Sequence, residues 1–146
     1  MRDKRFVAEH RGGLLKKEQH QQLMQWGCDC AEHVLYLFGK EIDIRLIYAL
    51  KVARGWIEEN ASVGDAREAS LGAHSVARES SNPTSILVAR SVGHAVATAH
   101  MADHSLGAAL YALKAVKSAH KSIKTERNWQ NDQLPAQIKE LVINAR

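Results

Sequence analysis

The segment GHAVATAHMADH, Gly93–His104, decides how the rest of the chain is expected to fold. Its three histidines are separated mostly by alanine, glycine and valine, and no Lys, Arg, Asp or Glu occurs across residues 91–102 or 105–113. Surface helices usually carry a charged face, whereas a helix that is apolar all round is usually buried. These two segments are therefore expected to form an Ala/Gly-rich central helix pair.

The composition favours helix throughout. The chain has 146 residues, of which 45% are hydrophobic and 25% charged, the balance of a globular domain. Ala, Leu, Lys, Glu, Gln and Arg are plentiful, and proline occurs only twice. No β-branched run alternates with polar residues, so strands have no support. The sequence predicts an all-α fold, a compact bundle of five to six helices.

Apolar spacing and helix-end signals place the individual helices. Ser62, followed three residues later by Asp65, is typical of an N-cap, and Pro83 suits the first turn of a helix. Asp103 or Ser105 caps a fifth helix, unless the fourth and fifth form one kinked rod. The expected helices cover about residues 17–38, 43–58, 62–78, 83–102, 105–124 and 135–144.

We expect three parts along the chain. Residues 1–16 form a polar N-terminal arm, and residues 17–125 form the helical domain. Residues 126–146 comprise a linker, within NWQNDQLP, and a short C-terminal helix. The apolar side of that helix covers either the core or a second chain, which leaves a homodimer open; this side consists of Leu134, Ile138, Leu141 and Val142.

Location and redox state follow from simple features. The opening MRDKRFVAEHRGG lacks the apolar block of a secretion signal, and no apolar run is long enough to cross a bilayer. We therefore expect a cytoplasmic protein with no membrane partner. Cys28 and Cys30 point to different sides of a helix and have no second pair to complete a zinc site, so they are expected to be reduced, small apolar residues.

The histidines allow a metal site as the weaker alternative. On one helix, His100 and His104 lie about 40° apart and His94 about 80° from His104, so an H-x-x-x-H pair is available. No Glu follows the first histidine, so the metalloprotease motif is absent. A third ligand has to come from elsewhere, from His33, His74 or Cys30.

The preferred interpretation is structural. A buried imidazole needs hydrogen-bond partners, because an unpaired buried polar group costs about 1–3 kcal/mol. Nothing in the sequence offers a nucleophile motif, a phosphate-binding glycine loop or an acid–base dyad. We therefore expect no catalytic residue, no bound metal and no cofactor. The expected network in the core comprises Asp29, His94, Thr98, His100 and His104.

Two glycines inside the expected central helices indicate close packing. Glycine costs about 1 kcal/mol against alanine in a helix interior. Gly93 and Gly107 are therefore expected to contact bulky side chains, for which Trp26 and Trp56 are the obvious candidates.

A basic stripe is the candidate partner surface. If the fifth helix reaches residue 124, its four lysines fall within about 80° of one another. Such a stripe suits nucleic acid or an acidic protein, although no aromatic residues interleave it for base stacking. The net charge of +4 argues against an acidic mimic of nucleic acid. The stripe consists of Lys114, Lys117, Lys121 and Lys124.

Four segments together resemble a known family. In order they are WGCDCAEHVLYLF (Trp26–Phe38), ALKVARGW (Ala49–Trp56), DAREASLGAHSVAR (Asp65–Arg78) and ARSVGHAVATAHMADHSLGAALYALKAV (Ala89–Val116). They resemble the Imm-five-like putative immunity proteins of bacterial polymorphic toxin systems over about residues 20–118. The most specific part is the G-H-A-x-A-T-A-H-x-A-x-H run.

The resemblance implies an α-helical cytoplasmic protein that binds and neutralises a cognate protein toxin and has no catalysis of its own. Two alternatives stay open beside it. One is a nucleic-acid-binding helical protein that uses the lysine stripe. The other is a small metalloprotein that uses the histidines.

Overall fold

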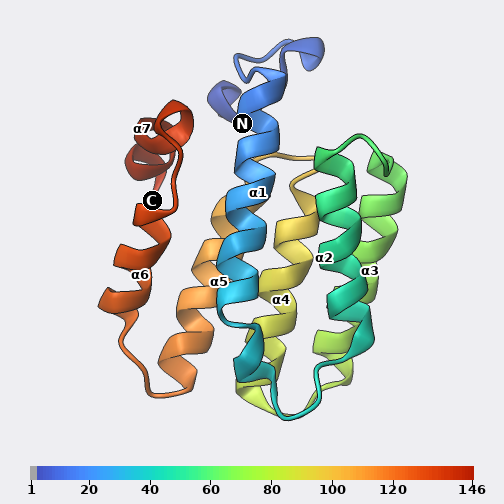
Figure 1. Cartoon of the computed structure of the whole chain (residues 1–146), viewed down its shortest axis with the longest axis vertical. Helices are drawn as coiled ribbons and strands as arrows, with labels where there is room; N and C mark the ends of the chain where they lie inside the picture. Colours follow the sequence, from blue (N-terminus) through green and yellow to red (C-terminus); the bar gives the residue numbers. More distant parts are fainter. Residues whose placement is uncertain (1–2) are drawn as a thin grey trace.

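The computed structural model describes residues 3–146, and within them the chain is all-α. The fold class is confirmed, but the expected five to six helices are too few: the described residues form seven α-helices, three short 3-10 helices and no strand. Figure 1 shows the long helices running side by side. The α-helices are α1 (Lys17–His33), α2 (Ile44–Ile57), α3 (Val63–Glu79), α4 (Pro83–Ala97), α5 (His104–Ser118), α6 (Ile123–Asp132) and α7 (Ala136–Ala145).

Side chains at the helix starts fix several of these boundaries. Ser62 accepts a hydrogen bond from the Asp65 backbone N–H, and Asp65 reciprocates at the Ser62 N–H, so α3 begins with the expected cap. Asn82 caps α4 ahead of Pro83. Between α4 and α5 the helical bonding is interrupted after residue 97, and these are two helices and not one kinked rod.

Helix α4 is the centre of the bundle. It packs against α1, α2, α3 and α5, and lies between α5 and the α2–α3 pair in Figure 1. Most of its inward residues are small, and alanines on α1, α2, α3 and α5 meet them. Small side chains let the helix backbones approach closely, which is how one helix accommodates four neighbours. The expectation of an Ala/Gly-rich central pair describes α4 and α5 well.

A second core region lies between α1, α5, α7 and the N-terminal arm. Trp26 is its largest side chain and is fully buried. Ile138 and Val142 of α7 are fully buried against it, and Leu134 and Leu141 join the same cluster. The apolar side of the last helix therefore packs on the core of its own chain.

Helix α6 corrects the expected linker at residues 126–132. Ser122 caps its start by accepting the Thr125 N–H. Near its end, the Trp26 indole donates to the Gln130 carbonyl at 2.8 Å, and the Gln130 amide donates to the Ala109 carbonyl at 3.0 Å. These bonds tie α6 to α1 and α5. The contacts of one buried glutamine with other helices thus stabilise a helix in a polar segment that the sequence predicts to be a linker.

The polar N-terminal arm is folded onto the body where it is described, from residue 3. It contains the 3-10 turns Lys4–Phe6 and Glu9–Arg11. Its apolar residues Phe6 and Leu15 are buried in the second core region, and the Leu15 N–H donates to the Val7 carbonyl at 2.9 Å. Residues 1 and 2 of the expected arm lie outside the described residues.

Replacement of Trp26 tests this packing. Trp26→Ala is expected to lower the free energy of unfolding by about 3–5 kcal/mol, because it leaves a cavity and removes the hydrogen bond to α6. Trp26→Phe keeps most of the volume and should cost clearly less. Urea unfolding followed by circular dichroism measures both. Equal stability of all three proteins would contradict the placement of α6 on α1.

Candidate functional site

Four imidazoles form a continuous row across three elements of the bundle. They come from His74 on α3, His94 on α4, His104 on α5 and His100 in the α4–α5 connection. Successive ring centroids lie 5.5 Å apart from His74 to His94, 5.3 Å from His94 to His104, and 5.2 Å from His104 to His100. All four side chains are half-buried, whereas the sequence analysis placed the last three in the interior.

Two of these rings occupy glycine notches in the neighbouring helix. A Cβ placed on Gly93 of α4 would lie 2.6 Å from the His74 ring, and one on Gly107 of α5 would lie 2.8 Å from Nδ1 of His94. The glycines therefore do face bulky side chains, but these are histidines. The expectation that Trp26 and Trp56 fill these positions is wrong. Each imidazole packs where the next helix lacks a side chain.

Hydrogen bonding fixes the protonation state of His74. Arg90 donates to its Nδ1 at 2.7 Å, so that nitrogen must be unprotonated. Burial, followed by the positive charge of Arg90 and the neighbouring His94, lowers the pKa of His74 from 6.5 to about 4. His74 is therefore neutral at pH 7.

His94 is held on three sides. Its Nδ1 lies 3.1 Å from Nδ1 of His104, so one nitrogen donates and the other accepts. Its ring stacks on Tyr111 with centroids 5.0 Å apart, and the Lys114 ammonium lies 4.9 Å from the Tyr111 centroid. Burial, then the nearby His104 and Arg90, lowers the pKa of His94 below its ordinary value. The contacts thus run without a break from His74 to Lys114.

The structure assembles only part of the network expected from sequence. Thr98 is buried, and its hydroxyl donates to the His94 carbonyl at 3.3 Å. The Thr98 carbonyl lies 2.6 Å from Nε2 of His20, a histidine that the sequence analysis did not select. Asp29 instead accepts a hydrogen bond from Arg54 of α2 at 2.9 Å.

The histidines offered for a metal site, His94, His100 and His104, lie together in the row with His74, whereas His33 and Cys30 lie elsewhere. Among residues 3–146 no group of three or more His, Cys, Asp or Glu side chains has a geometry that could hold a metal ion. His33, one suggested third ligand, stacks on Trp129 and lies 2.5 Å from a Glu126 oxygen. Cys30 is fully buried, and burial raises the pKa of its thiol well above the ordinary value.

The lysine stripe is not one helix face. Helix α5 ends at Ser118, and His120 adopts a left-handed conformation with φ 59°. The Lys121 N–H donates to the Val116 carbonyl at 2.9 Å, which closes the helix end. Lys114 and Lys117 remain exposed on α5, whereas Lys121 lies in the following turn and Lys124 lies on α6.

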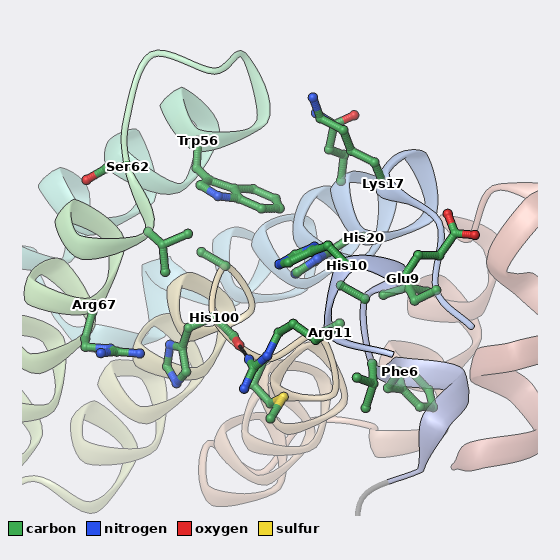
Figure 2. Close-up of a pocket in the computed structure, with 18 of the residues that line it drawn as sticks. Phe6, Glu9, His10, Arg11, Lys17, His20, Trp56, Ser62, Arg67 and His100 are labelled. Carbon is green, nitrogen blue, oxygen red and sulfur yellow. Dashed lines mark hydrogen bonds between the residues drawn. The ribbon is translucent and has the colours of Figure 1, made fainter. Parts of the chain in front are cut away.

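A cavity of about 770 Å³ lies beside the row, where the N-terminal arm crosses the ends of the helices. Its walls come from the arm, α1, the end of α2, the α2–α3 connection, the start of α3 and the α4–α5 connection. In Figure 2 the His100 ring lies between the side chains of Arg67 and Arg11, with Trp56 and His20 on another wall. His100 therefore belongs to both the row and the cavity.

The cavity was not predicted from the sequence. Its distinctive side chains come from segments that are far apart in the chain, and none carries a local motif. They meet only because the arm folds back, where Arg11 donates to the His100 carbonyl at 3.3 Å. The only feature pointing here was the histidine count of the G-H-A-x-A-T-A-H-x-A-x-H run.

Comparison with known families gives one result. A family model described as Imm-5 like putative immunity protein matches residues 13–137. The chain belongs to this family. No curated protein and no solved structure matches it.

The family match extends beyond the expected residues 20–118 and includes the whole histidine row. It also includes α6, the helix that was taken for a linker. The arm residues 6–11, which form one wall of the cavity, precede the matched region. Membership of the immunity-protein family therefore covers the scaffold and the row, while the cavity is completed by residues outside the match.

The glycine notch can be tested with a double-mutant cycle. Gly93→Ala is expected to destabilise the protein by about 1–2 kcal/mol, because the new methyl group overlaps the His74 ring. In a His74→Ala background the same change should stabilise by up to about 1 kcal/mol, since alanine is the better helix former. Chemical denaturation of the four proteins measures the coupling. Additive effects would contradict the notch.

Acid should weaken the fold through the row. The pKa of His74 is about 4 in the folded protein against 6.5 unfolded, and the pKa of His94 is also lowered, so the unfolded chain binds more protons in this window. Stability is full above about pH 6.5 and falls as the pH drops toward about 4, by about 1–2 kcal/mol given partial solvent screening.

His74→Gln should reduce this loss of stability at low pH, which is measured as the shift of the melting temperature between pH 7 and pH 4.5. His120→Gln is the matched control, because His120 is exposed in the turn after α5. Identical pH profiles for His74→Gln and the parent would show that His74 does not carry the effect.

Proposed function

We propose that this chain is an immunity protein that binds and neutralises a cognate bacterial toxin in the cytoplasm by protein–protein contact, without catalysis. The observation that carries the proposal is the family match over residues 13–137. Among the described residues no helix is long and apolar enough to cross a membrane.

We further propose that the toxin contacts the histidine face, defined here as the row of four imidazoles together with Arg78, Arg90, Tyr111 and Lys114. Within residues 3–146, Arg78, Arg90 and Lys114 form no ion pair. Arg90 contacts His74, and Arg78 donates to the Ser75 hydroxyl at 2.9 Å. A face with cations that lack carboxylate partners favours an acidic surface on the toxin.

The side chains of the histidine face suit a protein partner. Tyrosine and arginine are enriched at interfaces, and Tyr111 is held rigidly between His94 and Lys114. A residue already fixed in place loses little conformational entropy on binding. Lys117, one turn beyond Lys114 on α5, extends the same surface and supplies a polar rim.

The nucleic-acid alternative has lost the geometry on which it rested. It required four lysines along one helix, and only Lys114 and Lys117 share α5. The metalloprotein alternative is disfavoured by the positions of the proposed third ligands. His33 and Cys30 are engaged away from the row, and His74, which lies in the row, accepts a hydrogen bond from Arg90 at its Nδ1. Neither alternative has a specific observation in its favour.

The experiment is co-expression with the product of the neighbouring gene as the candidate toxin. The parent protein is expected to restore growth of cells that express the toxin. The double variant Arg78→Glu/Lys114→Glu should weaken binding at least about tenfold, about 1.4 kcal/mol, and reduce the rescue, because it reverses two charges of the histidine face. Isothermal titration calorimetry on the purified pair measures the affinity.

Lys139→Glu is the control, since Lys139 is exposed on α7 and lies outside the histidine face. Circular dichroism checks that all variants remain folded. If the parent protein neither binds the toxin nor restores growth, the proposed immunity function is wrong. Full binding by the double variant would leave that function standing but exclude the histidine face as the contact.

A further inference from the structure

The cavity beside the histidine row has the size and the lining of a small-molecule site. Its volume of about 770 Å³ lies within the range of ligand pockets, about 300–1,000 Å³. Aromatic and aliphatic side chains form much of the wall, and a few polar groups interrupt it. In such a site the apolar wall buries a small ligand, and the few polar groups fix its orientation.

Hydrogen-bond donors without partners line this cavity. Arg67 is exposed on α3 and makes no ion pair or hydrogen bond within residues 3–146, and the Trp56 indole N–H likewise makes no hydrogen bond there. Arg11 uses one N–H for the His100 carbonyl and keeps further donors. Figure 2 shows Arg67 and Arg11 on either side of the same part of the cavity.

The acidic side chains on the wall do not neutralise this part of the cavity. Glu59 pairs with Lys17 at the rim. Glu9 comes from the arm, and in Figure 2 its carboxylate points away from Arg11 and Arg67. The region around Arg67 and Arg11 therefore keeps a positive charge, and an anion can bind there to the guanidinium groups. Carboxylates suit this geometry, because they accept two parallel N–H bonds from one guanidinium.

The rest of the wall is suited to an aromatic or apolar group. The His20 ring lies 4.9 Å from the Trp56 ring, tilted by 54°. Burial is the main cause that lowers the pKa of His20, so this imidazole is uncharged at pH 7, with Nε2 donating to the Thr98 carbonyl. Trp56 and a neutral His20 thus present an aromatic surface beside the cationic region.

We propose that the cavity binds a small organic acid, with its carboxylate held by Arg67 and Arg11 and its aromatic or apolar part against Trp56. This site shares only His100 with the histidine face, and the proposal does not rest on toxin neutralisation. The arm residues 6–11 close one side of it and lie outside the family match, so they set which acid is accepted by this particular chain.

The test uses 1-naphthylacetate and 3-phenylpropionate as probes, each paired with its uncharged amide. On the full chain, calorimetric titration is expected to show each acid binding at least tenfold more tightly than its amide. In ¹H–¹⁵N spectra, the indole resonance of Trp56, assigned with Trp56→Phe, should shift during the titration. The indole resonance of Trp26, which is bonded to the Gln130 carbonyl, should stay unchanged.

Arg67→Gln should weaken binding of the acids at least tenfold and leave the amides unaffected. Arg78→Gln is the matched control, because Arg78 lies on the same helix but does not line the cavity. No binding of either acid at millimolar concentration, equal binding of acid and amide, or full binding by folded Arg67→Gln would each overturn the site. Toxin binding by Arg67→Gln is expected to stay intact, which separates this outcome from the proposed function.

Discussion

The spacing of the three central helices depends on imidazole rings that occupy the space of missing side chains. His74 of α3 fits against Gly93 of α4, and His94 of α4 fits against Gly107 of α5. Each contact lets the helix backbones approach while keeping a polar ring between them. Because these rings are only half-buried, the same residues that space the helices also form an outer surface. Changes that alter this surface at the histidines therefore alter the packing as well.

This double role constrains the charge of the histidine face. Packing against the next helix buries the imidazole ring and disfavours its charged form. The pKa values of His74 and His94 are lowered for this reason. At neutral pH His74 and His94 therefore add no charge to the face, and Arg78, Arg90 and Lys114 supply positive charge. Those cations lie at the margins, where they can be exchanged without disturbing the glycine notches, except for Arg90, which also orients His74. Substitutions at Arg78 or Lys114 are therefore expected to change the charge of the histidine face while the fold is kept.

Local signals predicted the elements whose ends are set by neighbouring residues. Ser62 with Asp65 marks α3 in the sequence and Pro83 marks α4, and the uncharged stretch marks the centre of the bundle. The features that were predicted wrongly or missed depend on contacts between residues far apart in the chain. Helix α6 is fixed by Gln130, which is buried between residues about twenty and a hundred positions away. The end of α5 depends on His120 in a left-handed conformation that favours glycine or asparagine, so the lysine stripe seemed longer than it is. No local pattern reveals the cavity, because its walls come from segments that are far apart in the chain.

The two proposed surfaces meet at one connection and differ in how they are built. The histidine face lies on three helices inside the family match, so its geometry follows from the scaffold. The cavity needs the arm, which is held mainly by the burial of Phe6 and Leu15 and by Arg11 at the His100 carbonyl. An acid bound between Arg67 and Arg11 would join the arm to α3 and add a second tie across the cavity. The α4–α5 connection carries His100 from the row into the cavity wall, and α3 carries both Arg67 and His74, so occupancy of the cavity can alter the histidine face through either element.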